Sequence, residues 1–532
     1  MKNILTKTII SAALVFSAAL VSFAAPKSEA QFDRLIKTYT LNPDGSQELR
    51  VQKQLTIYTH AAMNSLYGET FIVYDPSYQH LTVNESYTRQ KDGTVVTTPD
   101  NAFVEVLPSA AADAPAYNGL KEMVVVHTGL ELGATIYLDY TITTEAGALP
   151  ALDIFEQIEE LSPIKNYVLS VSVPAGTPLH YELLNGRTAP RISEADGMQT
   201  VTWTLKNVKP RPRSLAVSVP AGNVQAVAVT TFPSREAALE VITSQAYSPE
   251  DEAVRSLLDS FNEGKADRRS VMDKINDYVV SELGLSRLSF VQTGYRVRPA
   301  ADVIGSAYAT SMEKALLADA LMKAAGQDSE IGLVFPLTED RAAAGLSSLM
   351  AVSSFPVCTD WHCADLMSIG DYVSVCGLDG KEMDREQAPA LLENVSTMSI
   401  SAADGEDLGN GYYSFAFPAG DSQWLRREYA STTANTTRSV NLLLSYLPEE
   451  TLTYTLAVGE GLAPVVMPED RTVSNSVGTV SVKTEQKDGA TVITKHLKLG
   501  VQLITPALYP QYYRLMSEWY TICTSPLIFK AE

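Results

Sequence analysis

Ser311 and Lys314 carry side chains that could start a nucleophilic reaction, because they stand three residues apart at the start of a predicted helix. Residues at this spacing share one helix face, so the lysine amine could take the proton of the serine hydroxyl. A serine needs such a base, since a helix end can lower the pKa of a thiol but cannot ionise an alcohol. The pair indicates hydrolysis or acyl transfer by an activated serine.

A structural interpretation of the same segment requires no chemistry. Thr310 and Glu313 have the spacing of a capping box, in which threonine caps the helix and glutamate reaches back to the backbone. Penicillin-recognising enzymes, which use the Ser-x-x-Lys spacing, also need a Lys-Thr-Gly strand. Only Lys483-Thr484-Glu485 approaches that motif. We therefore favour the capping box and keep active serine chemistry as the alternative.

Three cysteines and one histidine lie close together in the sequence: Cys358, His362, Cys363 and Cys376. Four such ligands could hold zinc, but the spacing lacks the Cys-x-x-Cys pair of structural zinc sites. Buried or disulfide-bridged cysteines are the simpler interpretation. We expect no metal and no cofactor, because the chain also lacks a His-Glu-x-x-His motif and a phosphate-binding glycine loop.

The elements that must position these residues form an α+β region. Ser248-Pro249-Glu250-Asp251 predicts a helix start, with serine as N-cap and proline in the first position. A second helix is expected from Asp267 through Val279, and a third from Thr310 to Ala325, which Gly326 ends. Three strands are expected to follow: Ile331–Phe335, Cys363–Ile369 and Tyr372–Cys376. Ser311 would then begin the third helix.

Hydrophobic alternation with a period of two marks the residues on either side. From about 35 to 235, strand-like runs are separated by turn signals such as Asp196-Gly197. An antiparallel β-sandwich, or two, is expected there. Beyond about 400, Thr479–Glu485 and Thr491–Leu499 flank a hairpin turn, and Tyr509 to Tyr520 should be helical. The predicted fold class is multidomain and mainly β.

The first residues predict a signal peptide. Lys2 and Lys7 give a positive start, and an apolar run from Ile9 to Phe23 follows. Small residues then fit cleavage after Ala24, or as late as Ala30. The run is too short to cross a bilayer, which takes about 20 residues. We expect the mature chain to be exported, either to the periplasm or to the extracellular space.

Charge and length limit the partners and the number of domains. The formal net charge of −21 repels phosphate backbones, so nucleic acid is not expected as a partner. No later stretch is apolar enough for a membrane helix, so no integral membrane segment is expected after signal cleavage. Roughly 500 residues is too long for a single core. We predict an N-terminal β-sandwich domain or domains over 31–235, an α+β domain over 236–400 and a C-terminal β domain over 401–532.

Several strings in the first β region resemble a domain of unknown function of secreted bacterial proteins, where it precedes a transglutaminase-like core. They are Val73–Gln79, Asp92–Val96, Ala114–Tyr117 and Leu130–Ile136. The stretch from Pro468 through Tyr509–Tyr513 to Lys530 is similar to the small β-domain that usually closes such chains. This resemblance implies a three-part architecture and says little about chemistry.

The middle region resembles the transglutaminase-like branch of the papain-type fold. In that family a cysteine begins a helix in a string such as Gly-Tyr-Gly-Asp-Cys-Lys-Asp-Lys-Ala. The corresponding string here is Ala307-Tyr308-Ala309-Thr310-Ser311-Met312-Glu313-Lys314-Ala315, and Lys323–Gly326 keeps the frame further on. Both glycines have become alanine and the nucleophile position is Ser311. The resemblance therefore implies degenerate catalytic machinery.

The same resemblance implies a histidine on a following strand and an acid that orients it. His362 is the best match for the histidine, because a strand-like run follows it. Asp371 and Asp379 are off the expected position, so no acid is assigned. Ser311 and His362 are thus degenerate positions rather than assigned catalytic residues.

We expect a cell-envelope protein whose transglutaminase-like module is catalytically inactive and binds a peptide, protein or glycan. The alternative is a protease-like hydrolase or acyltransferase that uses Ser311. A third class, a purely structural multidomain spacer, predicts that no cleft remains beside Ser311. The sequence leaves open the ligand, the oligomeric state and the disulfide state of the three clustered cysteines.

Overall fold

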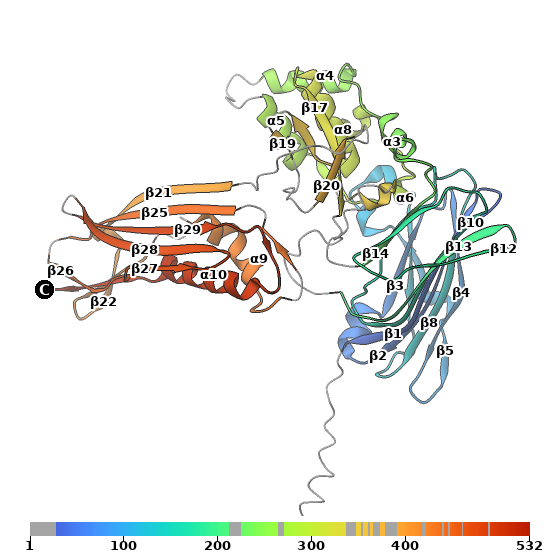
Figure 1. The fold of residues 1–532 in the computed structure, drawn as a ribbon, viewed down its shortest axis with the longest axis horizontal. Helices are drawn as coiled ribbons and strands as arrows, with labels where there is room; N and C mark the ends of the chain where they lie inside the picture. The colour runs from blue at the N-terminus through green and yellow to red at the C-terminus, as the bar shows by residue number, and fades with distance from the viewer. Residues whose placement is uncertain are drawn as a thin grey trace, which may run out of the picture.

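The computed structural model of this chain is mainly β, with several sheets and more than one domain, as the sequence predicts (Figure 1). It describes residues 28–211, 225–263, 271–336, 347–352, 355–359, 362–364, 373–377, 391–417, 422–438, 441–444, 447–459, 461–487 and 490–532. The three largest clusters of buried apolar side chains span 30–229, 232–357 and 400–529. Each of these regions therefore has a core of its own.

An eight-stranded sheet forms one layer of the first region, in the order β12-β13-β10-β1-β2-β8-β4-β5. Its strands are β1 (Ala30–Leu41), β2 (Gln47–Ile57), β4 (Gln79–Arg89), β5 (Val95–Thr97), β8 (Thr135–Thr144), β10 (Ile164–Pro174), β12 (Arg191–Ala195) and β13 (Met198–Val208). Neighbouring strands are antiparallel except β1 and β10, which run parallel. The predicted antiparallel sandwich thus contains a parallel pair, which alternation cannot reveal because both pairings have a period of two.

Two three-stranded sheets pack against this layer. They consist of β3 (Glu69–Tyr74), β7 (Lys121–Val126) and β6 (Phe103–Val106), and of β11 (His180–Leu184), β14 (Ala226–Thr230) and β9 (Asp153–Gln157). Ile154 and Val227 share a buried cluster with Trp203 of the large sheet, and Val125 shares another with Leu138. The alternating strands bury one face in this way, so the sandwich architecture is confirmed.

Helix α8 (Ser311–Ala324) is the buried helix of the second region. The other α-helices are α3 (Arg235–Thr243), α4 (Glu252–Glu263), α5 (Val271–Asp277), α6 (Phe290–Thr293) and α7 (Ala300–Ser306), and the strands β15 (Gly284–Ser286) and β16 (Tyr308–Thr310) run parallel. An antiparallel sheet in the order β19-β18-β17-β20 comprises β17 (Ser329–Pro336), β18 (Val357–Thr359), β19 (His362–Ala364) and β20 (Val373–Gly377). Helices and sheet together give the predicted α+β region.

The first helix expected in this region starts one turn later than predicted. Asp251 accepts the backbone N–H of Ala253 at 2.9 Å, and α4 begins at Glu252. Ser248 instead accepts the N–H of Glu250 at 3.1 Å in the preceding turn. Two residues that can cap compete here, and the carboxylate is favoured at the positive helix end. The second helix is described from Val271, so its predicted start at residue 267 lies outside the described residues.

The third region is a sheet in the order β21-β25-β29-β28-β27 with a helix packed on it. The strands of this sheet are β21 (Leu391–Ser401), β25 (Leu447–Ala457), β27 (Arg471–Ser474), β28 (Gly478–Lys487) and β29 (Ala490–Leu499), and the packed helix is α10 (Tyr509–Thr524). A smaller sheet holds β22 (Gly405–Gly409), β23 (Tyr412–Phe415), β31 (Leu527–Ala531) and β26 (Leu462–Val466). The predicted hairpin and the C-terminal helix are both confirmed, although β21 and β25 run parallel.

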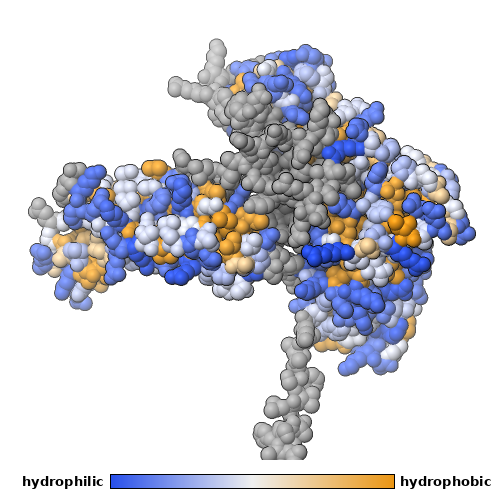
Figure 2. All heavy atoms as spheres, viewed as in Figure 1, coloured by the Kyte–Doolittle hydropathy of each residue, from blue (hydrophilic) through white to orange (hydrophobic). Residues whose placement is uncertain are grey.

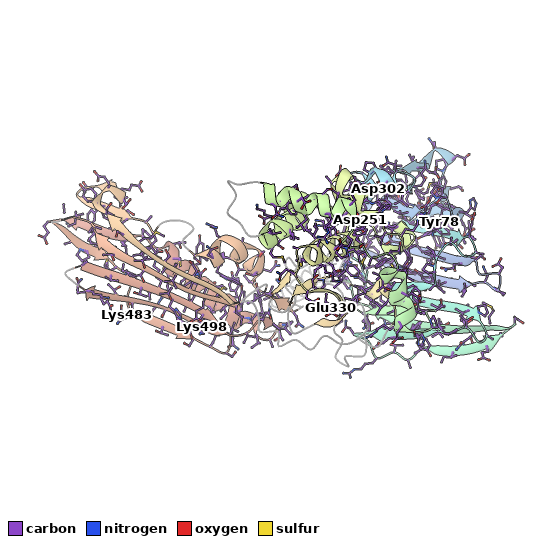
Figure 3. All side chains as sticks on the ribbon, turned by 90° about the horizontal axis from the view of Figure 1, so that it is seen from above. Tyr78, Asp251, Asp302, Glu330, Lys483 and Lys498 are labelled. Carbon is purple, nitrogen blue, oxygen red and sulfur yellow. The ribbon has the colours of Figure 1, made fainter. Side chains whose placement is uncertain are left out.

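The side of these regions that Figure 2 shows is mostly polar where residues are described. Hydrophilic residues cover much of the described surface in Figure 2, with apolar residues in small patches. Within the described ranges, no helix combines the length and the apolarity that crossing a bilayer requires. Figure 3 shows Tyr78 where the first region meets the central helices, whereas Lys483 and Lys498 lie on the separate C-terminal sheet.

Candidate functional site

Ser311 begins α8 and lines a small cavity of about 160 Å³. Its side chain is half-buried. The lining residues are Leu288, Ser289, Phe290, Thr293, Arg296, Val297, Thr310, Ser311, Met312, Leu349, Met350, Val352 and Phe355. Most of them are apolar, and Ser289, Thr293 and Arg296 add hydrogen-bonding groups. A cleft beside Ser311 is therefore present, which weighs against the purely structural spacer.

The predicted capping box closes the start of α8. Thr310 Oγ1 accepts the backbone N–H of Glu313 at 3.2 Å, and Glu313 Oε2 accepts the N–H of Thr310 at 2.8 Å. Two backbone donors beside Ser311 are thereby satisfied within the helix start itself. The other end of the helix also matches the prediction, because Gly326 has the positive φ of +81° that suits the residue after a helix.

Arg298 fixes the capping glutamate. Its guanidinium donates to both carboxylate oxygens of Glu313 at 3.0 Å and to the carbonyl of Tyr308 at 2.7 Å. It also lies 4.2 Å from the centre of the Tyr308 ring. Glu313 has no solvent exposure and Arg298 only 12%. A buried two-pronged pair of this kind is strong and orientation-specific, so Glu313 is committed to holding the loop against the helix.

Lys314 points away from Ser311. Its ammonium group donates to the carbonyl oxygen of Val279 at 2.8 Å. Burial lowers the pKa of Lys314, because the charged amine loses its water. Among the described residues no hydrogen bond joins Lys314 to Ser311. The Ser-x-x-Lys spacing is therefore present in the sequence without the contact that serine chemistry needs.

The backbone of His362 lies toward the far end of α8. His362 pairs with Thr359, which pairs with Ser329. Ser329 Oγ donates to Asp319 Oδ1 at 2.8 Å. Asp319 stands more than two turns beyond Ser311, about 12 Å along the helix axis. This register weighs against a Ser311–His362 pair, but the imidazole lies outside the described residues, so its assignment stays a prediction.

The clustered cysteines lie on three strands of one sheet, with β18 and β19 adjacent and β20 separated from them by β17. Cys358 of β18 pairs with Cys363 of β19, and Cys376 lies on β20. The side chains of all three lie outside the described residues, as do Asp371 and Asp379 entirely. The cysteine interpretation and the unassigned acid therefore stay predictions.

Asp153 reaches from β9 of the first region into one wall of the Ser311 cavity. Its Oδ2 accepts the N–H groups of Leu349 at 2.9 Å and Met350 at 3.2 Å. The hydroxyl of Tyr295 donates to the same oxygen at 3.1 Å. Burial raises the pKa of Asp153 to about 6, and these hydrogen bonds only partly oppose the effect. A residue of the β-sandwich thus anchors two cavity-lining residues, a link that the sequence analysis did not find.

Two strings that carry the N-terminal resemblance also lie at this junction. The hydroxyl of Tyr78 donates to the carbonyl of Val291 at 2.8 Å, and the hydroxyl of Tyr308 accepts the N–H of Ala116 at 2.8 Å. Tyr78 belongs to the Val73–Gln79 string, and its position at the junction is visible in Figure 3. The strings therefore have a physical role in docking the first region onto the central module.

A solved structure shares this architecture. The crystal structure of a Parabacteroides distasonis protein described as a "putative protease" is 36% identical to this chain, with a TM-score of 0.83. The match covers 94% of this chain and 99% of that one. This chain belongs to the same family. The likeness to the Parabacteroides relative extends over all three regions, because the uncovered share is smaller than any one of them.

The first and last regions also match family models. The domain of unknown function DUF3857 matches residues 43–212, and the domain of unknown function DUF3858 matches residues 418–529. These matches confirm the resemblance of both regions to domains of unknown function. The M1 zinc metallopeptidase of Deinococcus radiodurans is 13% identical over 38% of this chain and 42% of its own. The TM-score of 0.19 is too low to indicate a shared fold. No curated protein matches this chain.

Proposed function

We propose that this chain is an exported cell-envelope protein whose transglutaminase-like central module binds a peptide without cutting it. The observation that carries the proposal is a cleft beside Ser311 where, among the described side chains, Lys314 and Glu313 are both bonded to groups other than the hydroxyl. Lys314 donates to a backbone carbonyl, and Glu313 is held by Arg298. A serine without a base is a weak nucleophile.

The size of the cavity favours a peptide over other ligands. Pockets for whole small molecules usually measure about 300–1,000 Å³, whereas this cavity measures about 160 Å³. It has room for one apolar side chain, while the rest of the ligand would lie outside. Arg296 and Ser289 at its lining could bond the backbone of such a ligand.

The transglutaminase-like identity is supported by the order of the elements. Ser311 begins a buried helix, and an antiparallel sheet follows that helix in the chain. The string from residue 307 to 315 keeps the frame of the family with serine in the nucleophile position. Export is supported by the positive start and the apolar run of the first 24 residues.

A second candidate is a protease-like hydrolase in which Ser311 attacks the substrate. The description of the Parabacteroides relative favours it. It requires a base that approaches Ser311 from residues outside the described ranges, or after a rearrangement of Lys314.

Two substitutions at one position separate the candidates. The mature wild-type chain and its Ser311→Ala and Ser311→Trp variants are each incubated with a defined peptide library. Mass spectrometry then identifies the retained peptides and any new peptide ends. We expect retention without cleavage for wild type and Ser311→Ala, and loss of retention for Ser311→Trp, because the indole fills the cavity. New ends made by wild type and absent with Ser311→Ala would overturn the proposal.

A further inference from the structure

Strand β4 has one edge without a strand partner over part of its length. On one side it pairs with β8 from Gln79 to Arg89, whereas on the other side β5 pairs only with Tyr87–Arg89. Ser86 O accepts the N–H of Thr98 at 3.1 Å next to this pairing. Among the described strands none pairs with Leu81–Glu85 on that side. Alternate residues of this edge therefore present backbone N–H and C=O groups outward over about 17 Å.

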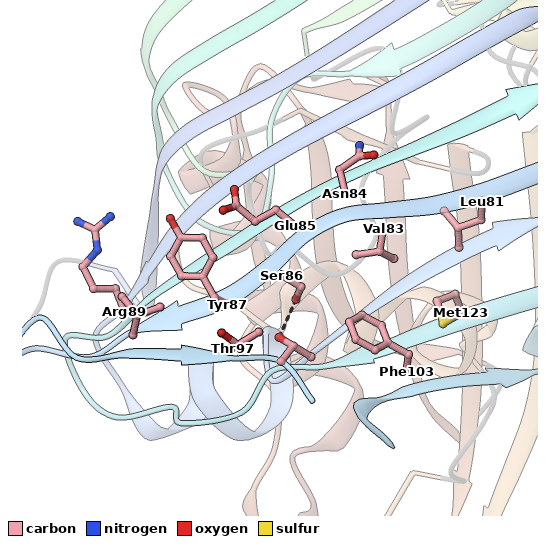
Figure 4. A pocket seen from close by; sticks show the side chains of 12 residues that line it. Leu81, Val83, Asn84, Glu85, Ser86, Tyr87, Arg89, Thr97, Phe103 and Met123 are labelled. Carbon is pink, nitrogen blue, oxygen red and sulfur yellow. Dashed lines mark hydrogen bonds between the residues drawn. The ribbon is translucent and has the colours of Figure 1, made fainter. Parts of the chain in front are cut away.

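A groove of about 670 Å³ runs along this edge (Figure 4). Leu81 and Val83 of β4 lie on one side, with Phe103 and Met123 of the smaller sheet across from them. All four are partly buried and pack against one small apolar cluster between the sheets. The groove is thus an apolar slot that lies directly beside unpaired backbone groups.

These two features together suit an extended polypeptide segment. The backbone of such a segment can continue the ladder beside β4, and its alternate side chains can enter the slot. A small apolar molecule would cover the edge and leave backbone groups without hydrogen bonds, which is costly. The hydroxyls of a sugar do not repeat at the spacing of a strand, so they match the ladder less well than a peptide backbone does. The groove therefore favours a peptide strand over those ligands.

The charges at the groove and on the whole chain indicate the charge of the bound segment. Two charged residues line the groove, and of these Arg89 lies over the ring of Tyr137 at 4.6 Å from its centre. Glu85 is exposed at the rim. The whole chain carries a net charge of −21. A lysine or arginine on the incoming segment would be attracted both by the long-range field and by Glu85.

The shape of the edge opposes a second copy of this chain as the occupant. The register shifts between Val83 and Glu85, and Asn84 stands outside the ladder. The Asn84 amide donates to Asp139 and Thr141, both at 2.9 Å, which holds the bulge in place. Two such edges paired antiparallel would bring two bulges and two Glu85 carboxylates together, which opposes pairing. A segment of a different chain meets neither obstacle.

We propose that the β4 edge and its groove bind a basic, extended segment of a partner polypeptide by adding it as a strand. Leu81 and Val83 select apolar side chains at alternate positions, and Glu85 selects a lysine or arginine. The groove shares no lining residue with the Ser311 cavity. This inference therefore stands or falls independently of the function proposed for the central module.

A phage-displayed library of random peptides of about ten residues, selected on the mature full chain, tests the proposal. We expect enrichment of peptides with alternate apolar residues and one basic residue. With Glu85→Arg the selection should shift to acidic peptides, and a peptide recovered on wild type should bind about fivefold more weakly. Glu194→Arg is the matched control, because Glu194 is exposed on β12 at the opposite edge of the same sheet.

Hydrogen exchange locates the bound peptide. The amides of Leu81–Glu85 should exchange more slowly in its presence, in wild type and in Glu194→Arg alike. The absence of enriched peptides, equal affinity for the two charge variants, or protection outside β4 and the facing strands would each overturn the proposal. Protection confined to the start of α8 would also overturn the proposal, and it would instead support peptide binding in the cavity beside Ser311.

Discussion

At the scale of single residues, the start of α8 is built from groups that hold structure. The capping box is visible in the sequence because Thr310 and Glu313 are local neighbours. Arg298 is not, since no spacing rule links it to Glu313 across the intervening loop and helix. Asp153 is harder still, because it comes from another region and contacts Leu349 only after the chain has folded.

Removing the guanidinium of Arg298 should leave the buried carboxylate of Glu313 without its ion-pair partner. We expect Arg298→Met to lower the free energy of unfolding by about 3 kcal/mol or more, because the buried Glu313 loses the guanidinium that compensates its charge. Lys323→Met on the same helix should cost less than about 1 kcal/mol, since that ion pair is partly exposed. Denaturant titration measures both. If adding Glu313→Gln to Arg298→Met restored none of the lost stability, the uncompensated charge of Glu313 would not be the cause.

Asp153 should make stability depend on pH. Its pKa is raised to about 6 in the folded chain from an ordinary value of 3.8. Because the pKa in the folded chain lies above the ordinary value, the protonated carboxyl of Asp153 stabilises the fold. This stabilisation is fully present below about pH 4 and is lost as the pH rises through about 6. Two pKa units correspond to about 3 kcal/mol. Relative to wild type, Asp153→Asn should gain about that much between pH 4 and pH 7 in unfolding titrations, whereas a constant difference would refute the assignment.

At the scale of elements, periodicity predicts type and local signals predict ends. The hairpin of β28 and β29, the C-terminal helix and both ends of α8 follow from alternation, turn residues and caps. The start of α4 was missed because two capping residues stand three positions apart. Parallel pairing of β1 with β10 was missed because strand direction is decided by connections and not by residue pattern.

Gly478 offers a test of packing within the hairpin. A Cβ there would lie 2.2 Å from the carbonyl oxygen of Lys498 and 2.9 Å from the Cα of Leu499, and backbone atoms cannot easily yield. We expect Gly478→Ala to destabilise the third region by about 2 kcal/mol. Gly500→Ala is the control, since a Cβ there meets no atom within 4 Å. Equal thermal midpoints for the two variants would contradict the close approach.

At the scale of the whole molecule, hydrogen bonds between described residues link the first two regions. Tyr78 and Ala116 of the first region donate hydrogen bonds to the second region, and Asp153 accepts one from Tyr295. The hydrogen bonds and ion pairs described for 391–532 stay within that range. The sequence predicts three regions, but it cannot say which of them interlock, because that depends on side chains far apart along the chain.

Loss of these links should affect one unfolding transition only. We expect Tyr78→Phe combined with Tyr295→Phe to lower the midpoint temperature of the transition that includes the first two regions. The free energy of unfolding of these regions should fall by roughly 2 kcal/mol. Differential scanning calorimetry can measure it, and Gly478→Ala identifies the transition of the third region. A common shift of all transitions in either variant would mean that the three regions unfold as one unit.

The intact mass of the chain after exposure to a fluorophosphonate shows most directly whether Ser311 can act as a nucleophile. We expect the unmodified mass for wild type, the same outcome as for Ser311→Ala. A covalent adduct that maps to Ser311 in wild type and disappears in the alanine variant would contradict it.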